Sequence, residues 1–104
     1  MDEAFLMDAA QMLKVMGHPL RLRIAQCLEP GELNVGDISQ AIGASQSATS
    51  QHLKALRMHG LLDARRQGAC MYYRIARPEV YKIIQCVRES AARAEGATQG
   101  LGGC

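Results

Sequence analysis

The side chains best suited to redox or metal chemistry are four cysteines: Cys27, Cys70, Cys86 and Cys104. No two of them are spaced as Cys-x-x-Cys, so the sequence predicts neither a zinc ribbon nor a thioredoxin-like redox motif. The N-terminus opens with Asp2 and Glu3, where a secretory signal would carry cations, and no apolar run approaches the roughly 20 residues of a membrane span. We therefore expect a cytoplasmic protein without a membrane partner, whose cysteines are thiols.

A second group of polar residues lies where a helix is expected, at residues 46–58. On a helical projection Thr49, Leu53 and Leu56 share one face, which is expected to enter the core. The opposite face carries hydroxyl, amide and amine side chains: Ser47, Ser50, Gln51 and Lys54. These groups donate hydrogen bonds to phosphates and base edges. Residues 39–62 contain no Asp or Glu, whereas a solvated helix usually mixes Glu with Lys, so the pattern favours a polyanionic partner over a neutral solvated face.

Two adjacent cations mark another candidate contact. Arg65, Arg66 and Gln67 precede Gly68 at the junction of two stretches with strand-like alternation. The Gln67-Gly68 step is typical of a β-hairpin turn. A hairpin with cations at its tip can lie along a DNA backbone or enter the minor groove. A charged turn that only keeps the protein soluble is the alternative.

The rest of the sequence predicts the elements that position these residues. Asn34 is a good N-cap for a short helix that ends at Gly43, and Ser45 caps the next helix, which closes at Gly60. The full order is a helix at about 2–15, a helix at about 19–29, the two capped helices, strands at 61–66 and 69–75, and a last helix from Pro78. This is a mainly α fold with a small β-hairpin, α-α-α-α-β-β-α. Residues 1–95 form one domain, and residues 96–104 are expected to be a flexible, Gly-rich tail.

Length and composition agree with one helical domain. Of 104 residues, 48% are hydrophobic and only 4% aromatic, so the core must come from aliphatic side chains, which suit packed helices. The net charge of +2 is weak evidence for a nucleic-acid partner by itself. In the first helix, Phe5, Leu6 and Leu13 belong to an apolar face wider than one core contact needs. That face predicts either a partner surface or a deeply buried helix.

Several motifs then occur in the order found in one family of regulators. They are HPLRLRI at 18–24, EL at 32–33, VGDI at 35–38, SQSATSQHL at 45–53, GLL at 60–62 and YYRI at 72–75. Together they resemble the ArsR-type winged helix-turn-helix repressors over roughly residues 13–87. The resemblance implies a symmetric dimer built from the first and last helices, a palindromic operator, and release by an inducer. It also assigns operator reading to the helix that begins at Gln46.

The residue pattern and the resemblance together define the candidate DNA-binding residues. They are Ser45, Gln46, Ser47, Ser50, Gln51, His52, Lys54, Arg65, Arg66 and Gln67. His52, at the edge of the reading helix, has two interpretations: a phosphate contact, or a packed and hydrogen-bonded side chain. Two reading helices about one DNA turn apart would occupy successive major grooves.

Family members that sense metals provide patterns for comparison. The arsenic-sensing pattern needs cysteines where this chain has Asn34 and Gly36. The zinc-sensing pattern needs His among the ligands on the final helix, which here contains none. Neither site is expected, and no cofactor is expected.

Other members sense oxidants or reactive sulfur through one cysteine in the second helix and one in the last. Cys27 and Cys86 lie in those helices and are the candidate inducer-sensing residues, although neither is in the family's register. Cys27 falls on an apolar stripe, where a thiol can be an inert core side chain, and Cys86 lies off its helix's stripe, either accessible or idle. Cys86 and Cys104 could also form a thiolate site for a metalloid; an idle Cys104 is the alternative.

We therefore expect a transcriptional repressor that binds double-stranded operator DNA as a homodimer and responds to a thiol-reactive inducer. The alternatives are a winged-helix protein-interaction module and a metal-sensing repressor with an unrecognised site. An enzyme is not expected, because no Ser/His/Asp set, carboxylate pair or phosphate-cradling loop appears.

Overall fold

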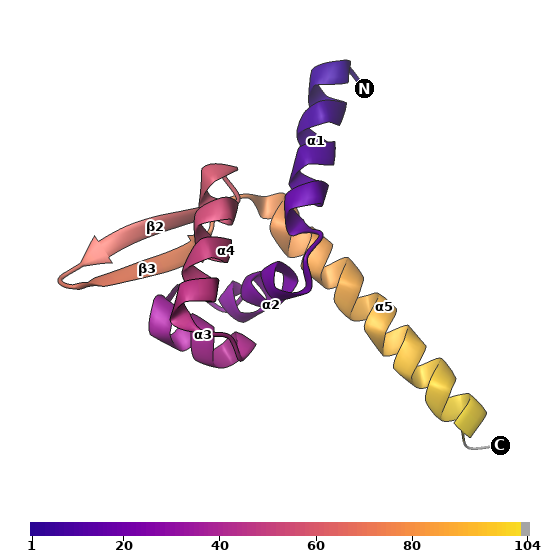
Figure 1. Ribbon diagram of the computed structural model, residues 1–104. Coiled ribbons are helices and arrows are strands. Elements are labelled where there is room, and N and C mark those ends of the chain that lie inside the picture. The colour runs from indigo at the N-terminus through magenta and orange to yellow at the C-terminus, as the bar shows by residue number, and fades with distance from the viewer. Residues whose placement is uncertain (103–104) are drawn as a thin grey trace.

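The computed structural model describes residues 1–102, with side chains described through residue 95. It is mainly helical with one small sheet, as the sequence predicted (Figure 1). The elements in chain order are α1 (Glu3–Met16), α2 (Pro19–Leu28), β1 (Leu33–Asn34), α3 (Val35–Ile42), α4 (Gln46–Met58), β2 (Leu62–Gln67), β3 (Cys70–Ile75) and α5 (Pro78–Gly102).

The helices α3 and α4 begin at residues whose side chains cap the first backbone N–H groups. The Asn34 side chain accepts a hydrogen bond from the Asp37 backbone N–H at 2.8 Å, and Ser45 Oγ accepts one from the Ala48 N–H at 3.1 Å. Both caps were predicted from the sequence. Gly43, with φ of 67°, ends α3 in the left-handed region that glycine adopts without strain. The short connection from Gly43 to Ser45 sets the angle between α3 and α4.

The sheet has one strand more than the sequence predicted. Its order is β1-β3-β2, with both pairs antiparallel. The hairpin was predicted, and its register runs from Leu62 opposite Ile75 to Gln67 opposite Cys70. The missed β1 is only two residues long, too short to show alternation, and its pairing of Leu33 with Tyr73 joins segments distant in sequence.

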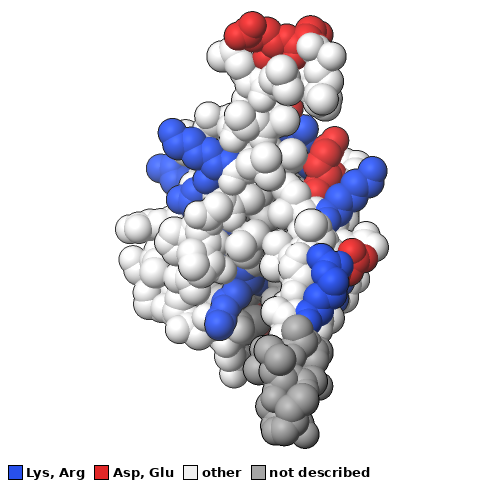
Figure 2. Space-filling view, turned by 90° about the vertical axis from the view of Figure 1, so that its right-hand side faces the viewer, with Lys and Arg blue, Asp and Glu red and all other residues white. Residues whose placement is uncertain are grey.

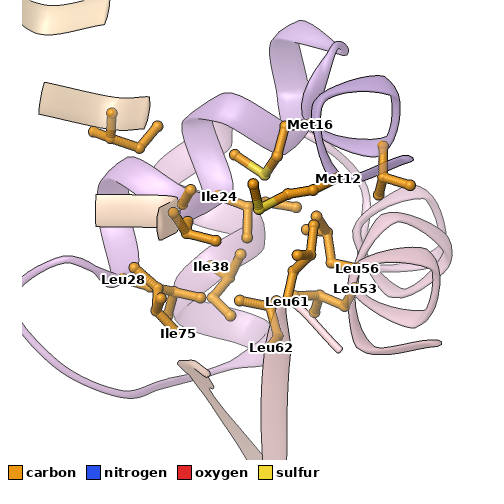
Figure 3. Packing of buried hydrophobic residues seen from close by; sticks show 14 of the residues in the cluster. Met12, Met16, Ile24, Leu28, Ile38, Leu53, Leu56, Leu61, Leu62 and Ile75 are labelled. Atoms are coloured by element: carbon orange, nitrogen blue, oxygen red, sulfur yellow. The ribbon is translucent and has the colours of Figure 1, made fainter. Parts of the chain in front are cut away.

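The core lies where the helices meet the base of the hairpin. Figure 3 shows its side chains pointing toward a common centre from α1, α2, α3, α4 and β2. The most deeply buried members include Met16, Ile24, Leu28, Ile38, Leu53, Leu56, Leu61 and Val80. They are almost all aliphatic, as the low aromatic content predicted. Because α4 contributes two of these residues, its rotation about its own axis is determined by the core.

The last helix is longer than expected. α5 ends at Gly102, whereas the sequence predicted a flexible tail from residue 96. Once a helix has formed, each added residue gains a backbone hydrogen bond, which offsets the cost of the glycines in this stretch. The division into a domain at 1–95 and a tail at 96–104 stays a prediction, and Cys104 lies outside the described residues.

The two end helices stand out from the body. In Figure 1, α1 rises from one end of the core and α5 runs away from it, on the side opposite the hairpin. Arg77, just before α5, bonds the carboxylate of Asp8 on α1 at 3.1 Å and so ties the two helices together. Among the described residues, no helix is both long enough and apolar enough to cross a membrane.

Candidate nucleic-acid interface

The α3–α4 unit presents α4 with one face buried and one face free. Thr49, Leu53 and Leu56 are at most 1% exposed, and the Thr49 hydroxyl donates to the Ser45 carbonyl at 2.7 Å. The buried face therefore leaves no unpaired polar group, which would be costly inside a core. The predicted inward face of α4 is confirmed.

The opposite face of α4 is open to solvent. The exposed side chains include Ser45, Gln46, Ser47, Ser50, Gln51 and Lys54. The face carries donors and acceptors but no carboxylate, so it can approach phosphates without repulsion. Its predicted outward orientation is confirmed, while the DNA contacts of its residues stay predictions.

The polar side chains of the hairpin differ in the contacts that they make within the chain. Arg65 Nε donates to both carboxylate oxygens of Glu32, at 2.9 and 3.0 Å, and its guanidinium also bonds Gln67 Oε1 at 2.6 Å. The guanidinium carbon lies 4.8 Å from the centre of the Tyr72 ring, within cation–π range. The Arg65 hydrogen bond lowers the pKa of Glu32. Arg65 and Gln67 are thus tied to the segment before β1.

Arg66 is the cation of the hairpin that is left for a partner. Its side chain is exposed and makes no hydrogen bond or ion pair with any residue that the structure describes. Glu32 was missed as part of this region, because nothing near it in sequence signals its contact with Arg65. The contacts of Arg65, Arg66 and Gln67 with DNA stay predictions, with Arg66 the freest to make one.

His52 is packed rather than pointing freely outward. It is partly buried, and its Nδ1 accepts a hydrogen bond from Arg21 Nε at 3.2 Å. Its ring centre lies 4.5 Å from that of His18. This geometry favours the packed interpretation over the phosphate contact.

Comparison with known proteins identifies the family. Residues 18–64 match the sequence model of the family described as bacterial regulatory protein, arsR family. The biofilm growth-associated repressor of Agrobacterium fabrum is 34% identical over 80 residues, which cover 77% of this chain and 68% of that protein. The chain belongs to the ArsR family. The protein is therefore a DNA-binding transcriptional regulator and not an enzyme.

Solved structures of relatives share the winged helix-turn-helix fold. HlyU of Vibrio cholerae, named a transcriptional activator, superposes with a TM-score of 0.79 at 35% identity, covering 85% of this chain and 96% of that one. A Mycobacterium bovis domain described as a homodimeric winged helix-turn-helix DNA-binding domain has a TM-score of 0.76 at 35% identity, covering 88% and 84%. The helix-turn-helix of this fold consists of α3 and α4, and its wing is β2 with β3; in helix-turn-helix proteins the second helix enters the major groove.

The three cysteines that the structure describes lie on three different elements: α2, β3 and α5. Cys27 is partly buried, its Sγ lies 3.1 Å from the Ile24 carbonyl, and burial raises the pKa of its thiol. Cys86 and Cys70 are exposed. The groove between α2 and α5 is lined by Leu22, Ile84, Val87 and Ala91 among others, and by neither Cys27 nor Cys86.

The surroundings of Cys27 and Cys86 decide which sensing sites are possible. Cys27 lines a hollow beside Ala41 of α3, and not the groove between α2 and α5. Neither Cys27 nor Cys86 therefore faces the groove between their helices. The predicted site of Cys86 with Cys104 lies partly outside the described residues. Within those residues, no group of three His, Cys, Asp or Glu is placed to hold a metal ion.

Proposed function

We propose that this protein is a homodimeric repressor that binds a palindromic operator through α4 and the wing and is released by an inducer. The observation that carries the proposal is the orientation of α4. Its apolar face is locked in the core, which leaves an acid-free polar face exposed on the same helix that reads DNA in this fold. Such a protein would act in the cytoplasm, where bacterial DNA lies.

The dimer is supported by the apolar surface of the end helices. On α1, Phe5 is 58% exposed, Leu6 49% and Leu13 56%, and Val87 of α5 is 44% exposed. Figure 2 views this side of the molecule, where uncharged side chains run down the middle and acidic side chains gather at the start of α1. Exposed apolar patches of this kind mark interaction surfaces. A two-fold symmetric pairing would cover the same patch on both copies.

The Gln51→Ala variant tests the reading role of α4. The amide of Gln51 can form a paired contact with one base, worth about 1–3 kcal/mol of discrimination, and a dimer has two copies. We expect operator affinity to fall at least tenfold, while affinity for unrelated DNA changes less than twofold. Fluorescence anisotropy at several salt concentrations measures both.

Gln85→Ala is the matched control, because Gln85 is an exposed glutamine on α5 whose amide bonds Glu89. It should leave both affinities unchanged. Equal losses on operator and unrelated DNA in Gln51→Ala would remove its base-reading role. A wild-type protein whose binding shows no salt dependence would point instead to a protein-interaction module.

We further propose that the inducer is a thiol-reactive species, and that Cys86 is the first thiol to react. Its exposure supports this role, whereas the raised pKa of Cys27 reduces the thiolate fraction that carries out the chemistry. The two thiols then act separately, since the groove that joins their helices is lined by neither.

The response should therefore depend on Cys86 more than on Cys27. Hydrogen peroxide, sodium tetrasulfide and arsenite are the probes, and operator binding before and after treatment is the measurement. Cys86→Ser should bind the operator like wild type and lose most of the response, and Cys27→Ser should lose a smaller part. Cys70→Ser, at another exposed thiol, is the control and should respond like wild type. An unchanged response in both Cys86→Ser and Cys27→Ser would reject the thiol proposal.

A further inference from the structure

Three basic side chains meet where α2 begins and α4 passes. Arg21 donates from Nε to His52 Nδ1 at 3.2 Å and from Nη1 to the Val15 carbonyl of α1 at 3.2 Å. The rings of His18 and His52 are 4.5 Å apart between centres and tilted by 50°. Arg21 therefore joins the end of α1, the start of α2 and the middle of α4.

The hydrogen bonds determine the protonation state of both imidazoles. His18 Nδ1 accepts a bond from the Leu20 backbone N–H at 3.1 Å, and this bond caps α2. His52 Nδ1 accepts its bond from Arg21, which has no acceptor of its own. An imidazolium carries a proton on both nitrogens and cannot accept either bond. The observed arrangement therefore requires both rings to be neutral.

The surroundings of His52 act in the same direction. Burial lowers the pKa of His52 most, and the charge that His18 would carry if it were protonated, followed by the charge of Arg21, lowers this pKa further. These two groups come from α2; α1, α3 and β2 also pack against α4, and within the described residues none of their carboxylates acts on His52. Protonation of His52 would thus place a second positive charge beside Arg21, with no carboxylate to balance it.

We propose that His18, Arg21 and His52 form a pH-sensitive connection that positions α4 against α1 and α2 and opens when the solution becomes mildly acidic. Arg21 and His52 are positioning residues in this role, because they set the placement of α4 rather than contact a ligand themselves. The consequence for operator binding rests on the proposed function; the connection itself does not.

The direction of the pH effect follows from linkage. The unfolded chain has ordinary histidines with a pKa near 6.5, and the folded pKa of His52 lies lower. Between these two values the unfolded state binds more protons, so the stability of the fold falls as the pH drops through about 6.5. The contribution is fully present above pH 7 and is lost on acidification.

The first measurement uses the unmodified protein, so it does not depend on any variant folding. The imidazole resonances of all three histidines are followed by NMR between pH 8 and 5. His52 should titrate below the pH of about 6.5 that is ordinary for histidine. The third histidine, His59, is exposed at the end of α4. The Arg21 Nε–H resonance should be lost as His52 titrates. A His52 midpoint at or above about 6.5 would overturn the proposal.

The second measurement compares thermal unfolding at pH 7.5 and 5.5 at one protein concentration. The wild-type midpoint should fall by roughly 5 °C, the size expected when one such interaction is lost from a domain of this length. The double variant His18→Asn with His52→Gln keeps a neutral acceptor at both positions, and its midpoint should fall by at most half as much as that of the wild type. The midpoint of His59→Gln, the matched control, should fall as much as that of the wild type. A double variant whose unfolding midpoint falls as much as that of the wild type would also overturn the proposal.

Operator binding separates this proposal from the proposed function. In the wild type, the ratio of operator affinity to affinity for unrelated DNA should drop several-fold from pH 7.5 to 5.5, and it should stay constant in the double variant. A pH-independent ratio in the wild type would contradict the positioning role. If no DNA binds at either pH, the proposed function fails, while the histidine titration and the unfolding data still decide the connection.

Discussion

Lys54→Glu should reduce operator affinity by roughly 100-fold or more at about 0.1 M salt. Lys54 is exposed on the outer face of α4, beside Arg57 and Tyr73. The substitution removes a phosphate contact and puts a like charge against the DNA backbone, which costs several kcal/mol at a close contact. Because a dimer carries the change twice, the loss should exceed that of a single contact. Affinity for unrelated DNA should fall as well, and the salt dependence of binding should become less steep.

Lys82→Glu makes the same change in net charge on an exposed lysine of α5, an element that is neither α4 nor the wing. It should lower the affinity less than threefold. This comparison separates a local contact from the general effect of charge on a protein that carries only +2 overall. Equal losses in the two variants would mean that α4 does not approach the DNA at Lys54, and the proposed interface would have to be moved.

Phe5→Glu combined with Leu6→Glu should convert the protein to a monomer and weaken operator binding by about 100-fold. These side chains are largely exposed in the single chain, so their replacement removes little from its own core. In a dimer they would be covered, and a buried unpaired carboxylate is strongly unfavourable. A monomer also loses the gain from binding two half-sites at once, which can reach a factor of 100 or more. Sedimentation analysis measures the mass, and anisotropy measures the affinity.

Gln11→Glu introduces the same residue into the same helix, at an exposed position on its polar side, and should remain dimeric. Circular dichroism should show unchanged helix content in both variants. If the Phe5→Glu, Leu6→Glu protein sediments as a dimer, the apolar face of α1 is not the dimer interface. If instead the wild type is a monomer at micromolar concentration, the dimer part of the proposed function is wrong.

The regulatory direction is the part of the function on which relatives differ. The similar proteins include a repressor from Agrobacterium fabrum and an activator from Vibrio cholerae. The operator-binding surface can be the same in both cases, because the position of the site relative to a promoter decides whether binding blocks or aids transcription. Repression is thus a separate proposal from DNA binding.

The features that could be predicted from the sequence are local. The caps at Asn34 and Ser45 and the turn at Gly43 depend on residues within one helical turn. The two faces of α4 follow from the 3.6-residue period, and the core that receives one of them confirms the assignment. The hairpin followed from its alternation and from the glycine at its turn, although the two-residue loop is Gly68-Ala69 and Gln67 ends the strand before it.

Other features depend on segments that meet only after the chain has packed. No short sequence pattern predicts the pairing of β1 with β3 or the bond of Arg65 to Glu32. The contact of Arg21 and His18 with His52 is equally unpredictable from local sequence. The same holds for Cys27 and Cys86, whose helices were correctly expected but whose directions depend on how α2 and α5 pack. A helical period determines which residues share a face, but the neighbour that each face meets depends on the packing of the whole chain.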